Sequence, residues 1–522
     1  MSNLFKLDIY HKDRFFLIKI EKQSKNGRTH YIIMDDIATY LGPKGYSIKK
    51  QYISIEEQHQ IRKELNVMPF VPKSSISKPH PFPVYRESPK KIYVPRFYGF
   101  STYGEPDAVT ISGGDDINVD FCGDLRDFQL PIVTKYINHV GESGGGLLEV
   151  PCGRGKTVMG LYIISQLQKK TLIIVHKEFL LRQWIERIQQ FLPNARVGRI
   201  QGEILDIQDK DIVIGMLQSL SMKDYPNSIF SSFGFTLIDE CHHIGAEVFS
   251  RALFKIVTSY MLGLSATMDR KDNITKVFKM FIGPIVYSEK RKGGDDVIVR
   301  AINYSHEDEE FGEQVYNFKG QVHYSVMIKK LCEFNFRSEF ILKVLADLLK
   351  ENGDQQIIVL AHNKSLLAYL HDAIKHRNIS SVGYYVGGMK EKDLKITETK
   401  KIIIATYAMA EEGLDIKTLT TLVMATPKTD VRQAVGRILR QKHSKPIIVD
   451  IVDQHDIFSR QWLKRKRYYK KQKYKIVSAD VDSYKKKEWI TLFENGKVKR
   501  KQKKKITQEN QFLQGVCMIS DD

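Results

Sequence analysis

The stretch LLEVPCGRGKTVMGLYIISQL, residues 147–167, contains three successive patterns that together decide the fold. It opens with a short apolar run at 147–150, which is typical of a strand buried on both faces. The turn PCGRGKT at 151–157 follows, and a helical pattern then continues to residue 167. A buried strand that leads through a tight turn into a helix is the first half of a parallel strand–helix–strand unit.

The same alternation of short apolar runs with longer amphipathic stretches occurs in two blocks of the chain. The first block has the expected strands LLEV, TLIIVH, DIVIGM, FTLIDE and YMLGLSAT, with helical patterns such as LLRQWIERIQQFL between them. The second block has QQIIVLAH, VGYYVG, KIIIAT, TLVMAT and PIIVDIV. The pattern predicts an α/β protein with two parallel-sheet domains in tandem.

The remaining segments differ from these two blocks in composition. The N-terminal part has mixed strand-like runs, and its Pro-rich middle, FVPKSSISKPHPFPVYRESPKKIYVP, is typical of an extended linker. A charged, helix-rich connector separates the two blocks, and a basic tail ends the chain. We therefore expect five segments, at 1–115 (accessory domain and linker), 116–290 (first sheet domain), 291–340 (connector), 341–455 (second sheet domain) and 456–522 (tail).

Bulk composition excludes several classes of protein. The chain has 522 residues, of which 42% are hydrophobic, so it can bury several cores. No window approaches twenty consecutive apolar residues, and the first residues lack the layout of a secretory signal, so we expect no membrane segment. The five cysteines are odd in number and none has Cys-x-x-Cys spacing, which favours reduced thiols over a disulfide framework or a zinc module.

The formal net charge of +20 is concentrated near the end of the chain. Residues 460–505 hold 19 Lys and Arg against four acidic residues. The run RQWLKRKRYYKKQKYK also interleaves Trp462, Tyr468, Tyr469 and Tyr474 with the cations. Cations attract phosphates and aromatic rings stack on bases, so this mixture favours nucleic-acid binding, with a solvated charge run as the alternative.

The turn at 151–157 carries the residue types that bind nucleotide phosphates. Gly153 and Gly155 let backbone N–H groups close around a phosphate next to a helix N-terminus. Lys156 can reach the outer phosphates, and the hydroxyl of Thr157 can ligate magnesium. The general pattern has a further glycine where Val150 stands. A chance Gly-Lys-Thr turn is the alternative, but the strand before it and the helix after it argue against chance.

The segment SSFGFTLIDECHHIG places Asp239 and Glu240 at the end of an apolar strand. Asp239 can hold the magnesium that Thr157 also ligates, and Glu240 can accept a proton from the attacking water. A charged loop after a strand is the alternative. His242 and His243 are adjacent and no third ligand is spaced to help them, so a protein-bound zinc is disfavoured.

The ordered set PCGRGKT, IDECHH, LGLSAT and QAVGRILR resembles the superfamily-2 helicases. Within them the chain is most similar to the XPB-like branch, which includes the translocase of transcription factor IIH. FPVYRESPKKIYVPRFYGFSTYGEP is similar to the segment that precedes the motor in helicases of nucleocytoplasmic large DNA viruses, of the poxvirus and African swine fever virus type. The resemblance covers about residues 120–455 and implies two tandem RecA-like domains with ATP and Mg²⁺ as cofactors.

The resemblance also implies a role for each matching position. In the first block, LRDFQLP matches a Q-type motif in which Gln129 reads adenine, while VHKEFLLRQW and IGMLQSL match motifs that touch the nucleic-acid backbone. Asp239 and Glu240 are the implied magnesium holder and general base. The residues implied to link hydrolysis to movement are Ser265, Ala266 and Thr267.

The second block supplies the remaining implied residues. ATYAMAEEGLDI matches a motif whose Gly413 and Asp415, with Glu412, sense nucleotide and nucleic acid. In QAVGRILR, Gln433 would lie near the γ-phosphate, and Arg437 and Arg440 would be arginine fingers. Arginines on the surface of a helix are the alternative for that pair.

Two positions depart from the pattern of the transcription-factor enzyme. Arg270, Lys271 and Asp272 stand where that enzyme has a strand-opening Arg-Glu-Asp, so Lys271 replaces the acid. Ser265 stands where it has threonine, which keeps the hydroxyl group.

The resemblance therefore implies an ATP-dependent DNA helicase or translocase of 3′ to 5′ direction that acts in viral transcription or genome handling. The alternatives are a double-strand DNA translocase or the motor subunit of a restriction-type complex, and a nucleic-acid scaffold without enzymatic activity. We expect DNA as the partner, with RNA or DNA–RNA hybrid as alternatives, and a viral RNA polymerase or transcription factors beside it. We further expect a monomer in the host cytoplasm at the viral replication site and in the virion.

Overall fold

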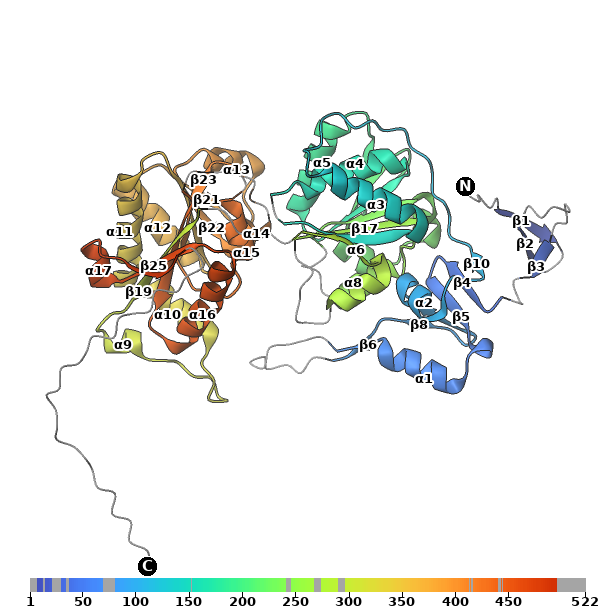
Figure 1. Ribbon diagram of the computed structural model, residues 1–522, viewed down its shortest axis with the longest axis horizontal. Helices are drawn as coiled ribbons and strands as arrows, with labels where there is room; N and C mark the ends of the chain where they lie inside the picture. Colours follow the sequence, from blue (N-terminus) through green and yellow to red (C-terminus); the bar gives the residue numbers. More distant parts are fainter. Residues whose placement is uncertain are drawn as a thin grey trace, which may run out of the picture. The chain divides into compact units, whose positions relative to one another are not determined.

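The computed structural model describes residues 37–68, 80–151, 153–240, 246–266, 274–289, 296–412, 414, 416–439, 443 and 445–494, and the backbone of 7–12, 15–20 and 30–33. The chain divides into two compact units, Met1–Arg291 with Glu411–Asp415, and Lys292–Ala410 with Ile416–Asp522. Each unit is built around one large sheet (Figure 1). The predicted α/β class with two tandem parallel-sheet domains is confirmed.

The sheet of the first unit has eight strands, and all but β14 are parallel to their neighbours. The five strands expected in this block are all present. In sheet order the strands are β14 (Ile204–Asp206), β13 (Val197–Gln201), β15 (Ile212–Met216), β12 (Thr171–Val175), β16 (Phe235–Ile238), β17 (Tyr260–Ser265), β11 (Gly145–Glu149) and β18 (Ile285–Ser288).

Helices cover both faces of this sheet because successive side chains of each strand point to opposite faces. In β11, Leu148 packs in the core under α3 (Leu130–Ser143), α4 (Lys156–Leu167) and α5 (Glu178–Phe191). The neighbouring Leu147 packs in the core on the other face. That second face is covered by α6 (Leu217–Met222), the short 3-10 helix η3 (Asn227–Ser232), α7 (Ala246–Leu253) and α8 (Ile274–Ile282).

The N-terminal region forms small sheets of its own. The first three strands, β1 (Leu7–Lys12), β2 (Phe15–Ile20) and β3 (His30–Ile33), pair antiparallel. A five-stranded sheet follows, in the order β10 (Ala108–Val109), β4 (Thr39–Gly42), β5 (Gly45–Lys49), β9 (Lys91–Val94) and β8 (Arg86–Glu87). The remaining elements are η2 (Lys50–Tyr52), α1 (Ile55–Glu64), α2 (Arg96–Tyr103) and the pair β6 (Asn66–Val67) and β7 (Phe82–Pro83).

This N-terminal module, residues 37–110, shares a hydrophobic core with the first sheet. Helix α2 packs against α8, and a Cβ on Gly99 of α2 would lie 2.1 Å from the ring of Tyr46, so only glycine fits there. The expectation of an extended linker at 70–95 was wrong for its described part, residues 80–95. Apolar residues between the prolines, such as Val84, Ile92 and Val94, are fully buried in strands or beside them.

The sheet of the second unit also has eight strands, and only β26 runs antiparallel to its neighbour. The five expected strands are again present. In sheet order the strands are β21 (Val382–Tyr385), β22 (Ile402–Thr406), β20 (Gln356–Ala361), β23 (Leu419–Met424), β24 (Ile447–Asp453), β19 (Ile298–Tyr304), β25 (Lys475–Asp480) and β26 (Ile490–Phe493).

Nine helices accompany these strands in the part of the second unit that the structure describes. In Figure 1, α11 and α12 lie on one side of the sheet and α14, α15 and α16 on the other. The helices are α9 (Glu309–Gly312), α10 (Tyr324–Glu333), α11 (Asn335–Glu351), α12 (Lys364–His376), α13 (Glu391–Glu398), α14 (Tyr407–Glu412), α15 (Arg432–Arg437), α16 (Asp456–Lys471) and α17 (Val481–Lys485).

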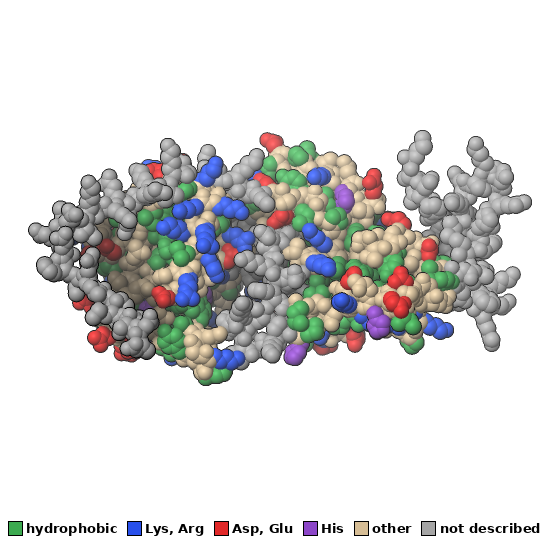
Figure 2. Space-filling model, turned by 60° about the horizontal axis from the view of Figure 1, so that its bottom comes forward, with side chains coloured by type: hydrophobic (Ala, Val, Ile, Leu, Met, Phe, Trp, Pro, Cys, Tyr) green, Lys and Arg blue, Asp and Glu red, His purple; other side chains and the backbone are tan. Residues whose placement is uncertain are grey.

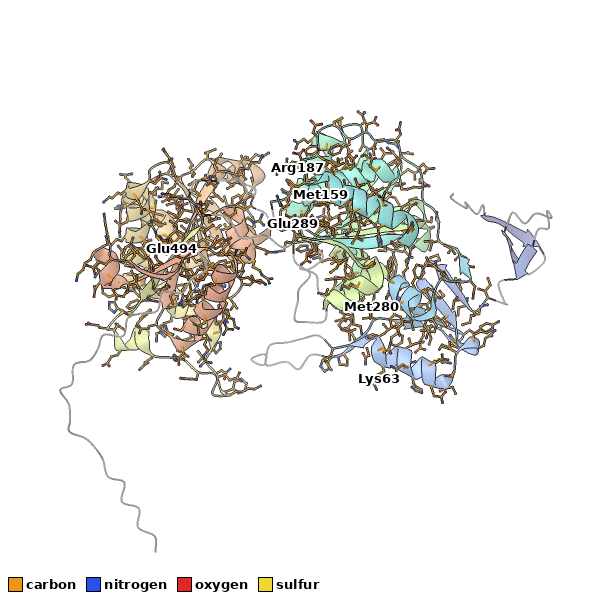
Figure 3. The ribbon with its side chains drawn as sticks, viewed as in Figure 1. Lys63, Met159, Arg187, Met280, Glu289 and Glu494 are labelled. Carbon is orange, nitrogen blue, oxygen red and sulfur yellow. The ribbon has the colours of Figure 1, made fainter. Side chains whose placement is uncertain are left out.

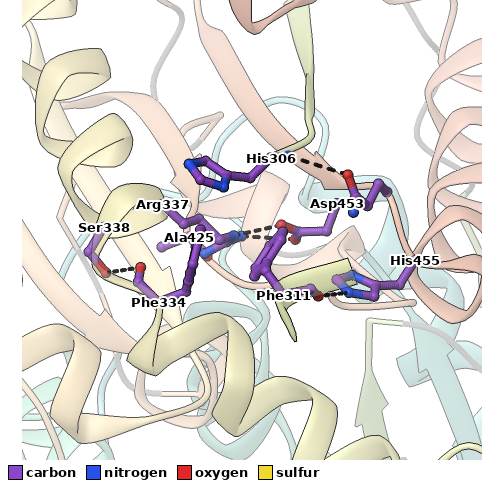
Figure 4. A network of polar contacts seen from close by, with 9 residues as sticks. His306, Phe311, Phe334, Arg337, Ser338, Ala425, Asp453 and His455 are labelled. Atoms are coloured by element: carbon purple, nitrogen blue, oxygen red, sulfur yellow. Dashed lines mark hydrogen bonds and ion pairs between the residues drawn. The ribbon is translucent and has the colours of Figure 1, made fainter. Parts of the chain in front are cut away.

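A buried polar network ties α11 to the middle of this sheet (Figure 4). The guanidinium of Arg337 donates to both carboxylate oxygens of Asp453, at 2.6 and 2.9 Å, and to the carbonyl of Ala425 at 2.8 Å. Both charged side chains are fully buried. Close by, a ring nitrogen of His455 lies 2.6 Å from the carbonyl oxygen of Phe311. Since each charge meets its partner, the network fixes the helix on the sheet.

Two expectations about the second unit need correction. The segment 291–340 is not only a helical connector, because it supplies β19, which lies between β24 and β25. The segment 456–522 is not only a tail, because α16, β25, α17 and β26 complete the unit as far as residue 494. The polar residues Arg300 and Asn303 interrupt the apolar pattern of β19, which is why its sequence did not indicate a strand.

Candidate active site

The phosphate loop connects the end of β11 to the start of α4. Gly153 and Gly155 have backbone φ angles of 83° and 75°, a region that favours glycine. Gly155 is the N-cap of α4, and no side chain caps the helix there. A helix N-terminus that no side chain caps is the arrangement that a phosphate site requires. Thr157 is half-buried in the same turn.

The side chain of Lys156 points to the acidic end of a neighbouring strand. It is buried, and its Nζ lies 3.1 Å from Oε1 of Glu240. Glu240 has a φ angle of 48°, a left-handed conformation that costs a non-glycine residue about 1 kcal/mol and is frequent at functional sites. The predicted phosphate lysine and the predicted general base are thus in direct contact.

Asp239 is buried beside this pair, directly after β16. One carboxylate oxygen accepts a hydrogen bond from the indole Nε1 of Trp184 at 2.9 Å, and the other accepts from the backbone N–H of Glu240 at 2.9 Å. Burial and the negative charge of Glu240 raise the pKa of Asp239 to about 6, while Lys156 and the indole N–H act in the opposite direction. The site therefore concentrates negative charge next to the phosphate loop.

Gln129 lies directly against the phosphate loop. Its amide Nε2 donates to the carbonyl of Arg154 at 2.9 Å, and its Oε1 accepts from the backbone N–H of Arg126 at 3.0 Å. A Cβ at Gly155 would come within 2.5 Å of the same amide. Gln129 is therefore built into the wall of the loop, and adenine reading by its amide stays a prediction.

The guanidinium of Arg154 bridges the loop to its surroundings. It lies 4.2 Å from the ring centroid of Phe128 and forms an ion pair with Glu289, which follows β18 (Figure 3). This contact ties the loop to the edge of the sheet. Met159, also labelled in Figure 3, is fully buried in α4 and holds the helix on the sheet.

Ser265 ends β17, the strand between the acidic strand β16 and the loop strand β11. Its carbonyl accepts a hydrogen bond from the backbone N–H of Val150 at 2.9 Å. Ser265 and Ala266 are buried. The structure thus brings Ser265 to the backbone at the start of the phosphate loop, while Thr267 lies outside the described residues.

The predicted residues of the second unit are described only in part. Gln433 and Arg437 stand one turn apart on α15, and Arg437 is buried. Arg440, Gly413 and Asp415, together with the segment 270–272, lie outside the described residues.

Trp184 belongs to a motif of the first block, but the sequence alone indicated no role for this residue. The available signal was a tryptophan on the inner face of α5, three residues after Leu181, which is also buried. Side chains at this spacing share one helix face. Its hydrogen bond to Asp239 could not be predicted because 55 residues separate the two in sequence.

Three further expectations concern absences. Among the described residues, no group of three or more His, Cys, Asp or Glu could hold a metal ion. In the same part of the chain, no helix is long and apolar enough to span a membrane. Cys122 and Cys332 are free thiols, and burial raises the pKa of Cys332 to about 11.

Three of the four aromatic residues of the basic segment do not behave as predicted, while the fourth, Tyr468, is half-buried. Trp462, Tyr469 and Tyr474 are buried in the second unit, with exposed fractions of 8%, 0% and 1%. Trp462 and Tyr469 lie on the inner face of α16, and Tyr474 directly precedes β25, so these three rings cannot stack on bases. The apolar inner face of an amphipathic helix explains the spacing that had suggested a nucleic-acid binding mixture.

Two protein-family models match the chain. "Type III restriction enzyme, res subunit" matches residues 123–270, and "Helicase conserved C-terminal domain" matches residues 341–442. Among solved structures, a fragment of a candidate HsdR subunit of a type I restriction enzyme from Vibrio vulnificus has a TM-score of 0.50 at 17% identity, covering 71% of each chain. This likeness concerns the fold alone.

Viral and cellular relatives match most of the chain. A candidate ATP-dependent RNA helicase of Acanthamoeba polyphaga mimivirus is 37% identical, covering 85% of this chain and 87% of that protein. A candidate ATP-dependent RNA helicase of African swine fever virus is 28% identical, covering 64% and 70%. The DNA 3′-5′ translocase XPB2 of Sulfurisphaera tokodaii is 23% identical, covering 63% and 81%. Given this identity to the mimivirus protein and the two helicase models in order, the chain belongs to the superfamily-2 helicases, and it is a nucleic-acid-dependent ATPase with relatives in large DNA viruses and in the XPB branch.

Proposed function

We propose that this chain is a 3′ to 5′ DNA helicase or translocase that serves transcription or genome handling of a large DNA virus. The observation that carries its ATPase chemistry is the cluster of Lys156, Asp239 and Glu240. A cation and two acids meet there beside an uncapped helix N-terminus. Such a cluster provides both the charge that holds a nucleotide phosphate and the base that activates water.

In this proposal Lys156 exchanges its partner when ATP binds. Without nucleotide its ammonium group pairs with Glu240. An outer phosphate would attract Lys156 more strongly than one carboxylate, because it carries more charge and meets the N–H groups at the uncapped start of α4. Glu240 then no longer pairs with Lys156 and can accept a proton from the attacking water. The exchange makes the base available only when substrate is bound.

Magnesium fits the donor set of this site. Asp239 is a buried carboxylate with two N–H donors, and the hydroxyl of Thr157 belongs to the first turn of α4. Carboxylate and hydroxyl oxygens are ligands that Mg²⁺ prefers, and the ion neutralises charge on the transferred phosphate. We assign Thr157 and Asp239 as the residues that would hold it.

The second unit would supply the groups that sense the γ-phosphate. Gln433 and Arg437 lie one turn apart on α15, so both can face one ligand. We assign Arg437 and Arg440 as arginine fingers, Gly413 and Asp415 as nucleotide sensors, and Ser265 with Thr267 as the coupling residues. Fingers on a second domain let ATP close the enzyme and hydrolysis reopen it.

The choice of DNA as substrate follows the XPB-like resemblance, and the XPB2 relative is named a DNA translocase. RNA is the second candidate, because the mimivirus and African swine fever virus relatives are named RNA helicases. Those viral relatives support a role in a virus. A viral RNA polymerase or transcription factor is the partner we expect, and the host cytoplasm and the virion are the compartments.

ATP hydrolysis by the full chain, measured with single-stranded DNA, duplex DNA, single-stranded RNA and DNA–RNA hybrid, tests the proposal. We expect DNA to stimulate hydrolysis several-fold, and Lys156→Ala to abolish the stimulated rate. Duplexes with a 3′ or a 5′ tail then test direction and strand separation. Stimulation by RNA alone would transfer the proposal to RNA, and wild-type turnover by Lys156→Ala would overturn the assigned ATP site.

A further inference from the structure

Helix α16 has two faces of opposite character. Its inner face carries Phe458, Trp462, Arg465 and Tyr469, all of them buried. Its outer face carries Arg460, Lys464, Arg467 and Lys471, all of them exposed, and these four cations are called the α16 stripe below. Residues spaced by three or four share one side of a helix, so the cations form a line along it.

The inner face fixes the helix in one position. Arg465 donates to both carboxylate oxygens of Asp450 at 2.8 Å each, and to the carbonyl of Lys428 at 2.6 Å. The hydroxyl of Tyr469 donates to Asp450 at 3.2 Å. Arg465 belongs to the basic segment, but its guanidinium is bound inside the unit. It anchors α16, whose outer face carries the stripe. The stripe is thus held on a rigid element.

None of the four cations of the α16 stripe makes an ion pair or hydrogen bond with a residue that the structure describes. On the same helix, burial lowers the pKa of Lys466, and the charge of Lys470 acts in the same direction. In Figure 2, Lys and Arg side chains gather in a band on the second unit, at the place that α16 occupies in Figure 1. Unpaired like charges repel one another, and a polyanion would relieve the repulsion.

We propose that the α16 stripe binds the sugar–phosphate backbone of a nucleic acid. From Arg460 to Lys471 the helix rises about 16 Å, and one strand of a duplex carries a phosphate about every 3.4 Å along its axis, so the stripe matches four or five phosphates. Phe458, Trp462 and Tyr469 of α16 are buried, and the stripe itself is made of cations alone, so the proposed contact is to phosphates.

This proposal rests on the proposed function, since it adds a contact for the nucleic acid on which the motor acts. It differs from binding by a basic tail because the stripe belongs to a helix of the folded unit. Truncation after residue 456 would remove helix α16 and the sheet strands β25 and β26, and would test folding instead of binding. Substitutions on the exposed face alone are therefore required.

The experiment compares two triple variants of the full chain that lose the same charge. The first is Lys464→Gln, Arg467→Gln and Lys471→Gln on the stripe. The control is Lys343→Gln, Lys350→Gln and Lys375→Gln, which are exposed residues of α11 and α12. Affinity for a labelled 30-nucleotide single strand and a 30-base-pair duplex is measured without ATP from about 0.05 to 0.3 M salt.

We expect the stripe variant to bind about 10- to 100-fold more weakly near 0.1 M salt, with a log–log salt slope shallower by about 2, because each phosphate contact contributes about 0.7 to 0.9. The control should keep the slope of the unaltered chain. The charge-conserving variant Lys464→Arg, Arg467→Lys and Lys471→Arg should keep it as well, which separates charge from folding.

Equal salt slopes in the stripe and control variants would overturn the proposal. An acidic protein partner would then be the ligand to test for the stripe. The ATPase result is read separately. Weaker binding by the stripe variant in a chain whose ATPase no nucleic acid stimulates would support the stripe and refute the motor. Stimulated ATPase together with equal salt slopes in the stripe and control variants would support the motor and refute the stripe.

Discussion

The indole N–H of Trp184 donates a hydrogen bond of 2.9 Å to the carboxylate of Asp239, and both side chains are buried. Trp184 lies on α5, in the segment whose motif resembles those that touch nucleic acid, whereas Asp239 is the proposed magnesium ligand. The bond therefore joins the helix that carries this motif to the proposed magnesium ligand through one side-chain contact. A shift of α5 on nucleic-acid binding would change the donor that orients the carboxylate.

The first prediction concerns magnesium. Trp184→Phe keeps the ring in the core but removes the N–H, and Asp239 loses one of its two hydrogen-bond donors. We expect the Mg²⁺ concentration for half-maximal ATPase to rise by about 10-fold, since residues behind a metal ligand typically contribute this much to affinity. The matched control is Trp489→Phe in the second unit. Identical Mg²⁺ dependence in both variants would refute a positioning role for Trp184.

The sequence predicted the fold more completely than the site. Apolar strands such as 171–175 and 402–406 are buried on both faces, and their pattern needs no tertiary information. Strands β19 and β25 were missed because polar residues interrupt their pattern. Their burial depends on neighbours distant in sequence, such as β24.

The residues of the proposed ATP site were predicted by motif, but their partners were not. The contact between Lys156 and Glu240 joins positions 84 residues apart, and periodicity within a segment carries no information on such a pair. For the basic segment, the function predicted for three of the aromatic residues was wrong. Its aromatic residues suggested base stacking, whereas Trp462 and Tyr469 are required by the core.

The second prediction separates the two partners of the resting ion pair. Glu240→Gln should abolish hydrolysis and keep nucleotide binding, because it removes the proposed base and the ion pair in which Glu240 competes with a phosphate for Lys156. Lys156→Ala should weaken nucleotide binding as well. Binding of a fluorescent ATP analogue and ATPase turnover, measured in parallel, check both outcomes. Equal loss of binding in the two variants would contradict the proposed exchange of partners.

The third prediction concerns the N-terminal module. Arg96 of α2 is nearly buried and donates to the carbonyls of Thr258 and Ser259 at 3.2 and 3.0 Å, just before β17. Burial lowers the pKa of Arg96 to about 10, so it remains charged at neutral pH.

Arg96→Met removes these donors and leaves two partly buried carbonyls without them, which should cost about 3 kcal/mol of unfolding free energy. The change should be seen in chemical denaturation of the full chain. As a control, Arg62→Gln breaks an exposed ion pair with Glu87 and should cost less than about 1 kcal/mol. Equal stability of the two variants would show that the module is not anchored through Arg96.

The fourth prediction concerns the buried pair of Arg465 and Asp450 under α16. Burial raises the pKa of Asp450, and the charge of Arg465 opposes this rise. Arg465→Met leaves the carboxylate buried without a cation, which should cost about 3 to 5 kcal/mol of unfolding free energy at neutral pH. In this variant the pKa of Asp450 in the folded state rises further above its value in the unfolded chain.

The sign of the pH dependence follows from that rise. Between the unfolded and the folded pKa the folded state binds more protons, so stability falls as pH increases through this window. The deficit of Arg465→Met relative to the unaltered chain should therefore be smallest near pH 4 and grow toward pH 7. Denaturant unfolding at several pH values measures it. A deficit that stays constant with pH would mean that Asp450 finds another cation, and that the anchor of α16 does not depend on Arg465.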